Sequence, residues 1–160
     1  METKKQHIAI IRMTGDVALN RDLKDTFRML RLYKKNNCVV VPNTPQYVGM
    51  IERLREKSTW GEIDEPTLKL LLEKRARVSN NQMMTAEYLK QHGKTDFDSL
   101  SKDIFNFKKE IKDIPGLKPF FKLKPPTGGF ERKGVKEQFS LGGALGYRKD
   151  GINILIRKMI

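Results

Sequence analysis

The sequence has few of the residues that form disulfides, metal sites and nucleophilic catalysts. Its 160 residues include one cysteine and two histidines. One cysteine cannot form an intramolecular disulfide, and Cys38 precedes three valines that indicate a buried strand, so we interpret it as a small core residue. His7 and His92 are far apart, and neither has neighbouring ligands at metal-site spacing. We therefore expect no metal, no cofactor and no acid/base pair.

Long apolar runs are also missing. No stretch approaches the roughly 20 apolar residues that a membrane-spanning helix needs. The N-terminal METKKQHIAI lacks the apolar segment of a signal peptide. We therefore expect a cytoplasmic protein with no membrane partner. Hydrophobic residues make up 38% of the chain, which is enough for a modest core in one domain with an appended part.

Acidic residues are scarce compared with basic ones. The chain has 32 Lys and Arg against 19 Asp and Glu, a formal net charge of +13, and a pI near 9.9. Such an excess points to a polyanion or an anionic membrane surface. Residues 1–57 hold twelve basic and six acidic residues, 58–114 hold ten of each, and 115–160 hold ten and three. The two ends therefore carry the excess, and we expect them to share an anionic ligand.

Residues 125–149, PPTGGFERKGVKEQFSLGGALGYRK, combine six glycines with several cations. Glycine lets backbone amides approach a ligand closely, so a phosphate is the first ligand to consider. The spacing from Gly129 to Gly134 matches a Walker A loop, but Val135 and Lys136 follow where Lys and Ser or Thr should stand. The later glycines follow no apolar strand, which disfavours a dinucleotide site. A flexible surface loop and a nucleic-acid-binding loop remain.

This segment has few clustered apolar residues. Ordering a residue costs about 1 kcal/mol or more, and little burial is available here to offset that cost. We therefore expect the segment to be mobile in the free protein and ordered by its ligand. On this interpretation Gly142 and Gly143 lie outside the core, and replacing them with valine spares the isolated fold.

The N-terminal third shows clear periodicity. Alternation predicts a strand over residues 7–13, and Asn20 can cap a helix that runs to about Tyr33. Apolar residues at spacings of four, four and three form its buried face. A separate face carries cations at helical spacing and, by this projection, no acid: Arg21, Lys24, Arg28, Arg31 and Lys35. A basic stripe is usually only a solvated face, so polyanion binding and simple solvation stand about equal here.

The remaining patterns complete the predicted fold. We expect a strand over 37–41, a helix from Thr44-Pro45 to about residue 57, a turn at Trp60-Gly61, helices from Asp64, Thr85 and Phe97, a strand over 119–123 and a C-terminal helix. This order predicts an α/β (α+β) two-layer β-α-β-α-β core with a small, mainly antiparallel sheet of the split-βαβ, ferredoxin-like kind. Residues 1–57 with 115–123 form that core, 58–114 a helical insertion, and 124–160 the glycine-rich basic loop and final helix.

Several of these patterns resemble one known family. Leu30-x-Leu32-x-Lys34-x-x-Asn37-x-Val39, followed by Met50-Ile51-x-x-Leu54, resembles the helix-strand-helix signature of the large-subunit ribosomal protein L thirty family. Three later segments are similar to its archaeal branch: Trp60-Gly61-Glu62-Ile63, Pro115-Gly116-Leu117-Lys118-Pro119 and Gly142-Gly143-Ala144-Leu145-Gly146-Tyr147. The resemblance covers nearly the whole chain. The related eukaryotic protein, large-subunit protein L seven, carries a long lysine-rich extension, so a start close to the first strand favours an archaeal source.

The resemblance implies a structural constituent of the large (50S) ribosomal subunit with a role in translation and subunit assembly, and no catalysis. Its implied partners are large-subunit rRNA, with 5S rRNA close by, and neighbouring ribosomal proteins; no homo-oligomer is expected. Cations and pliable loop residues become the candidate RNA-binding residues: Arg12, Arg21, Lys24, Arg28, Arg31, Lys34, Lys35, Lys124, Gly128, Gly129, Phe130, Arg132, Lys133, Lys136, Gly142, Gly143, Tyr147, Arg148 and Lys149.

Two alternatives remain open. A free-standing RNA-binding or RNA-remodelling module would share the basic surface, and an enzyme acting on nucleic acid would need a catalytic cluster that the sequence does not show. Among the loop aromatics, Phe130, Phe139 and Tyr147 could each stack on an unpaired base. Packing against the protein's own core is the slightly favoured interpretation for each of them.

Overall fold

The computed structural model describes residues 6–92 and 96–160. Its strands are β1 (His7–Arg12), β2 (Asn37–Pro42), β3 (Ser58–Glu62), β4 (Phe121–Lys122) and β5 (Gly146–Tyr147). Its α-helices are α1 (Arg21–Met29), α2 (Pro45–Arg53), α3 (Glu65–Arg75), α4 (Ala86–His92), α5 (Phe97–Phe105) and α6 (Gly151–Met159). Short 3-10 turns cover η1 (Ile111–Asp113), η2 (Gly134–Lys136) and η3 (Phe139–Leu141).

The strands form one mixed sheet in the order β4-β2-β1-β3-β5. β1 lies in the middle and pairs antiparallel with β2 and β3, while β4 joins β2 antiparallel and β5 joins β3 parallel. Along β1, Ile8 and Ile10 enter one apolar cluster, and Ala9 and Ile11 enter another. Both faces of the sheet are therefore covered. The predicted α+β class, the β-α-β-α-β order and the mainly antiparallel sheet are confirmed.

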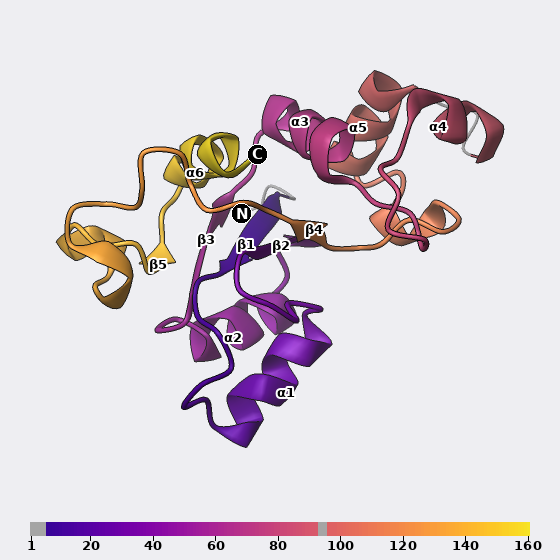
Figure 1. Cartoon of the computed structure of the whole chain (residues 1–160). Coiled ribbons are helices and arrows are strands. Elements are labelled where there is room, and N and C mark those ends of the chain that lie inside the picture. The colour runs from indigo at the N-terminus through magenta and orange to yellow at the C-terminus, as the bar shows by residue number, and fades with distance from the viewer. Residues whose placement is uncertain (1–5, 93–95) are drawn as a thin grey trace.

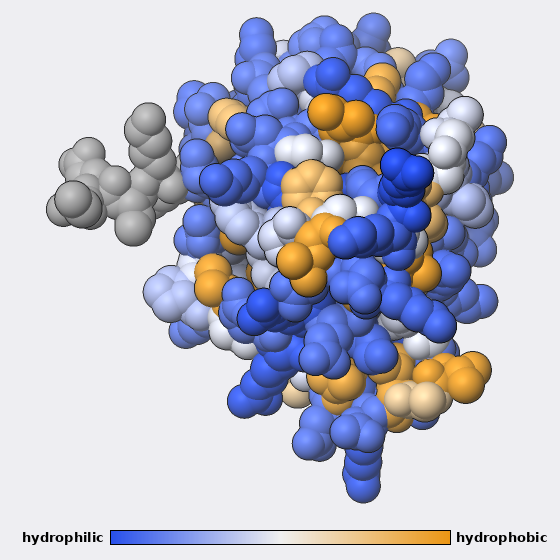
Figure 2. Space-filling view, turned by 90° about the vertical axis from the view of Figure 1, so that its left-hand side faces the viewer, coloured by the Kyte–Doolittle hydropathy of each residue, from blue (hydrophilic) through white to orange (hydrophobic). Residues whose placement is uncertain are grey.

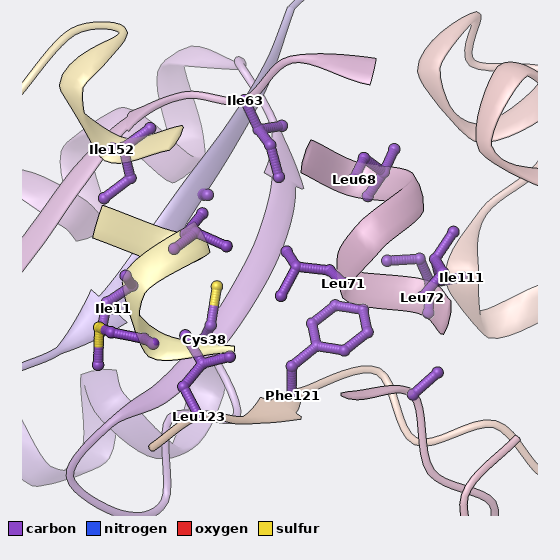
Figure 3. Close-up of a cluster of buried hydrophobic side chains, with 14 of the residues drawn as sticks. Ile11, Cys38, Ile63, Leu68, Leu71, Leu72, Ile111, Phe121, Leu123 and Ile152 are labelled. Atoms are coloured by element: carbon purple, nitrogen blue, oxygen red, sulfur yellow. The ribbon is translucent and has the colours of Figure 1, made fainter. Parts of the chain in front are cut away.

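Helices cover the two faces of the sheet (Figure 1). On one face, α1 and α2 contribute Phe27 and Ile51 to a cluster that also contains Ile10 and Trp60. On the other face, α3, α5 and α6 pack over a larger cluster. Figure 3 shows its side chains between the sheet and these helices, Leu71 and Ile152 among them. The β-α-β-α-β unit makes the two predicted layers, and the later helices add a third.

The prediction of a turn at Trp60-Gly61 was wrong, because both residues lie in β3 and pair with β1. A Cβ on Gly61 would lie 2.1 Å from the Lys149 carbonyl oxygen. Glycine therefore allows the segment before α6 to approach the strand, which is a known use of glycine inside strands. The third strand of the core is β3, and the predicted strand over 119–123 appears as the short edge strand β4.

Helix starts were predicted better than helix ends. Thr44 accepts a hydrogen bond from the Tyr47 amide (3.5 Å) at the start of α2, as its pairing with Pro45 predicts. α1 ends at Met29 rather than near Tyr33, because Arg31 has a positive φ of 59° that a helix cannot contain. α5 begins at Phe97, as predicted, and ends at Phe105.

Cys38 of β2 is completely buried within the larger cluster (Figure 3). Burial raises the pKa of its thiol to about 12. The thiolate is the reactive form of cysteine, so this thiol is inert at neutral pH. The interpretation of Cys38 as a small core residue is confirmed.

Candidate nucleic-acid interface

The first basic set lies on and after α1. Arg21 and Arg28 are exposed on the helix, and Lys24 is half-buried between them. Arg28 forms an ion pair with Asp25 (Nη1 to Oδ1, 3.6 Å), so the stripe does have an acidic neighbour, contrary to the helical projection. An exposed pair of this kind is weak and leaves Arg28 able to meet another anion.

The last two cations predicted for this stripe, Arg31 and Lys35, lie beyond the helix. Arg31 is half-buried and follows the helix end, while Lys34 and Lys35 are exposed in the turn before β2. The periodicity that placed them on one helical face therefore does not hold after Met29. We refer to Arg21, Lys24, Arg28, Lys34 and Lys35 as the α1 basic set.

Arg12 does not belong to this surface, because its side chain is buried at the end of β1. Its guanidinium donates to the carbonyl oxygens of Thr14, Leu32 and Tyr33 at 2.8 to 3.0 Å and to Asp16 at 2.6 Å. It also lies 4.3 Å from the centre of the Phe27 ring. These contacts, and not a phosphate, occupy the Arg12 guanidinium. The hydrogen bond from Arg12 lowers the pKa of the Asp16 carboxyl.

The second basic set lies on the glycine-rich segment beyond the β3 edge of the sheet (Figure 1). Its exposed cations are Arg132, Lys133, Lys136 and Lys149, and we refer to them, together with the exposed Lys124 two residues after β4, as the loop basic set. Figure 2 looks onto this side of the molecule, where hydrophilic residues dominate and apolar patches are small and separate. Gly128 and Gly129 lie at the surface with φ of 83° and 79°, in a turn that glycine adopts without strain.

The segment is folded onto the protein, contrary to the prediction of a mobile loop. The Phe139 amide donates to the Leu145 carbonyl (2.7 Å), and the Gly143 amide donates to that of Gln138 (2.9 Å). β5 then pairs with β3, and the Thr59 hydroxyl donates to the Gly146 carbonyl (2.9 Å). Turn and strand hydrogen bonds therefore supply the order that apolar content alone did not indicate.

Arg148 joins the segment to the sheet. Its side chain is 1% exposed, and it forms an ion pair with Glu131. Its Nε donates to the Thr59 hydroxyl (2.7 Å) and its Nη2 to the Ala144 carbonyl (2.8 Å). The guanidinium also lies 4.8 Å from the centre of the Phe139 ring. Arg148 was predicted to meet phosphate, but the structure places it inside and gives it internal partners.

The electrostatics of this contact are those of a partly buried ion pair. Burial by itself raises the pKa of the Glu131 carboxyl, but hydrogen bonds from Arg148, followed by the charges of Arg148 and Lys158, make the net shift downward. The folded protein therefore stabilises the ionised carboxylate. This stabilisation is present above the pKa of the unfolded carboxyl and is lost as the pH falls through the folded value.

The three loop aromatics have different surroundings. Phe130 is half-buried and packs against the larger cluster, as core packing predicts. Phe139 is 37% exposed and lies against Arg148. Tyr147 is 47% exposed, and its hydroxyl donates to Glu62 at 2.5 Å. Burial, then this bond and the nearby carboxylates, raise the pKa of Tyr147 to about 12.

Gly142 and Gly143 have different roles in the turn. Gly142 is exposed in a left-handed conformation with φ of 91°. Gly143 is buried, and a Cβ there would lie 2.1 Å from the Glu137 carbonyl oxygen. The prediction that both glycines lie outside the packed structure was therefore wrong for Gly143, whose lack of a side chain lets two backbone segments meet.

Replacing Gly143 with alanine should lower the free energy of unfolding by about 1–3 kcal/mol, because two backbone segments must separate. Gly49→Ala is the matched control, since a Cβ at Gly49 in α2 meets nothing within 4 Å. Alanine is the better helix former, so this variant should gain about 0.5–1 kcal/mol. Urea unfolding of both variants gives the comparison, and a neutral Gly143→Ala would contradict the packed turn.

Two residues that hold this interface in place were not predicted from the sequence, Arg55 and Asn153. Arg55 follows α2 and donates to the Gln138 side chain (3.1 Å), so it lies between α2 and the loop. Asn153 is buried in α6, where its Nδ2 donates to the Glu62 carbonyl (3.0 Å) and its Oδ1 accepts from the Asp64 amide (3.0 Å). The sequence could have predicted this role for Asn153, because it is a lone polar residue within the apolar stretch Ile152–Ile156.

The structure does not gather the two basic sets into one cluster. The α1 basic set lies on the helix layer over one face, whereas the loop basic set, apart from Lys124 just after β4, lies at the opposite edge of the sheet beside β5 (Figure 1). Among residues 6–92 and 96–160, no three His, Cys, Asp or Glu residues are placed to hold a metal ion. No helix in those residues has the length and apolar content to cross a membrane.

Comparison with known proteins shows the family to which this chain belongs. The pattern of the family "Ribosomal protein L30p/L7e" matches residues 8–56, which span β1 to the end of α2. "Large ribosomal subunit protein uL30" of Methanopyrus kandleri is 44% identical over 151 residues, covering 92% of this chain and 100% of that protein. The chain belongs to the uL30 family of large ribosomal subunit proteins.

Other uL30 proteins extend the match over nearly the whole chain. The uL30 of Nanoarchaeum equitans is 44% identical and covers 95% of this chain and 97% of its own length. That of Methanosphaera stadtmanae is 43% identical over 155 residues, with 95% and 99% covered. These relatives are archaeal, so the predicted family and its archaeal branch are confirmed. The matched length includes the residues of the later helices and the loop.

Proposed function

We propose that this uL30-family chain is a structural constituent of the large ribosomal subunit and binds large-subunit rRNA through the α1 and loop basic sets. The observation that carries the proposal is that both sets are held on a folded scaffold. α1 is fixed by its apolar face, and the loop is fixed by Arg148 and the packed turn at Gly143. Cations fixed in this way can match a folded RNA surface without first ordering a loop.

The chemistry of such binding is electrostatic and shape-dependent. Lys and Arg side chains neutralise phosphates and release condensed counterions. Folded RNA is recognised mainly through its backbone, its shape and its 2′-hydroxyl groups. Because the two basic sets lie apart, we propose that they contact separate RNA segments and hold them in a fixed relation. This role needs no catalysis, and it suits a protein that acts in subunit assembly and translation.

The proposed setting is the cytoplasmic ribosome, with neighbouring ribosomal proteins around the chain and 5S rRNA close to it. Family membership supports the ribosomal part of this setting, and the resemblance to the archaeal branch supports the position near 5S rRNA. We also propose that the chain divides into a core, a helical insertion and a basic C-terminal part, with β3 assigned to the core. The insertion, whose charges balance, would contact protein more than RNA.

Binding to large-subunit rRNA fragments should weaken steeply with salt. The expected slope of log affinity against log salt is about −0.9 for each phosphate neutralised on duplex and about −0.7 on single strands. Filter binding between low and physiological salt measures this slope. An unrelated RNA of the same length should show a similar slope at lower affinity, and a flat slope with rRNA would contradict the electrostatic account.

A further inference from the structure

A pocket of about 310 Å³ wraps around the outer edge of β2, and no residue of either basic set lines it. This volume is at the small end of the range of small-molecule sites, roughly 300–1,000 Å³. Leu30 and Tyr47 line it from the α1 and α2 layer, and Ile104 and Ile111 line it from the opposite layer. Val39–Pro42 of β2 lies between these walls. The pocket is therefore a slot in the plane of the sheet, with apolar walls above and below.

Pro119 opens this slot by ending the pairing of β2 with β4. The register places Asn37 opposite Lys122 and Cys38 opposite Phe121, so continuing it would bring Val40 opposite Pro119. Proline has no backbone N–H and cannot donate to the Val40 carbonyl. Within the described residues, no hydrogen bond outside the strand ladders reaches Val40. Pro119 itself lines the pocket.

The backbone of Val40 faces the slot. Antiparallel pairs alternate between those that exchange hydrogen bonds and those that do not. The bond from the Asn43 amide to the Gln6 carbonyl (2.8 Å) sets this alternation, so Val39 and Val41 bond to β1. Val40 therefore directs one donor and one acceptor outward. Its neighbour Pro42 has no donor, and the Pro42 carbonyl already accepts from the Thr44 amide (2.9 Å).

A second polar group of the pocket also lacks a partner. His7 lines the pocket and is 7% exposed, and its Nε2 donates to the Ile104 carbonyl (2.8 Å). Burial lowers the pKa of the imidazole, so the ring is neutral and Nδ1 is an acceptor. Nδ1 is buried and has no hydrogen-bond partner among the described residues. The slot thus combines apolar walls with the one outward-facing donor and one outward-facing acceptor of Val40.

The rim of the slot is basic. Arg31, Lys109 and Lys112 line it together with one acid, Glu110. Lys112 lies 3.8 Å from Glu110 and Lys109 lies 3.3 Å from Asp103, in surface pairs that a phosphate can displace. Arg31, which was predicted for the α1 stripe and is not in the α1 basic set, thus lies at this rim.

We propose that this slot binds a single unstacked nucleobase of RNA, with its Watson–Crick edge on the Val40 backbone and its faces between the two apolar walls. Each of the four bases presents an adjacent donor and acceptor on that edge. Proteins read splayed-out bases by such edge contacts combined with stacking. The basic rim would then meet the flanking phosphates. The inference rests on the proposed RNA-binding function, to which it adds a specific subsite.

The edge is too short for an added peptide strand. Strand addition gains its affinity from a row of main-chain hydrogen bonds. Here Pro119 and Pro42 leave only Val40 with outward-facing groups, so a peptide could form bonds at one residue alone. A nucleobase needs no more than this one donor and acceptor.

The test is an NMR titration of the full chain with each of the four nucleoside 5′-monophosphates. At least one should shift the Val40 amide and the Ile111 methyl groups in a saturable way. Ribose 5-phosphate should leave Val40 unmoved, because it offers the phosphate without the base. Absence of a Val40 shift with all four would overturn the inference, as would a shift produced only by a short extended peptide.

Pro119→Ala tests whether the unpaired backbone of Val40 is what binds the base. Alanine restores an N–H that can donate to the Val40 carbonyl and close the edge, so mononucleotide affinity should fall about tenfold. The exposed Pro125, outside the slot, gives the matched control Pro125→Ala, which should bind as the unchanged chain does. Equal affinity of the two variants would overturn the role of Val40. A chain that joins the large subunit but fails these tests would refute only the subsite.

Discussion

Replacing Arg21, Lys24 and Arg28 together with glutamate should lower the affinity for large-subunit rRNA by about 100-fold near physiological salt. Three phosphate contacts are lost and three repulsive charges are introduced on one helix. The salt slope should become less steep by about two to three units. The apolar face of α1, with Phe27 and Leu30 in the core, is untouched, so the fold should remain. Filter binding gives the affinity, and circular dichroism gives the fold.

The matched control carries the same change of charge elsewhere. Lys74, Lys102 and Lys108 are exposed on and beside α3 and α5, and in the described residues none of the three forms an ion pair. Lys69 is a poorer choice, because it pairs with Glu73 and with Asp98. The control triple variant should lose far less affinity than the α1 variant. Equal losses would contradict the division between basic ends and neutral middle.

Replacing Arg148 with methionine should lower the free energy of unfolding by about 3 kcal/mol or more, because it leaves the partly buried Glu131 carboxylate without its partner. Amide exchange should accelerate most across 134–147, where the turn and β5 depend on this contact. Arg132→Met is the control, since Arg132 is exposed in the same segment, and it should change stability by less than about 0.5 kcal/mol.

A double variant separates the ion pair from general packing. Adding Glu131→Gln to Arg148→Met removes the uncompensated carboxylate, so part of the lost stability should return. Urea unfolding of the two single variants and the double variant measures this coupling. Additive losses would show that Arg148 acts through its contacts with Thr59 and Ala144 alone, and would contradict the account of the pair.

The sequence predicted the parts of the fold that depend on local pattern. The alternation in β1, the valine run of β2, the Thr44-Pro45 start of α2 and the apolar face of α6 are all local patterns. The strand at Trp60-Gly61 escaped prediction, because a glycine read locally indicates a turn. A glycine is needed at position 61 because the Lys149 backbone, almost ninety positions later in the chain, packs against it.

The charge composition predicted where the candidate site lies, and the burial of individual residues in the structure showed which of them can belong to it. Composition identified the two basic ends, and most of their cations are exposed in the structure. Composition could not distinguish Arg12 and Arg148 from the other cations. Their guanidinium groups have internal carbonyl and carboxylate partners, and a residue count does not show whether an arginine is buried or exposed. The loop glycines posed the same problem, since Gly128 is exposed and Gly143 is packed.

The most direct test of the central claim is sedimentation of a tagged chain expressed in an archaeal cell. The account predicts that the chain runs with the large subunit on a gradient and leaves it only at high salt, and that the Arg21, Lys24 and Arg28 variant stays in the unbound fractions. A tagged chain that stays unbound while the large subunit sediments normally would contradict the assignment to the subunit.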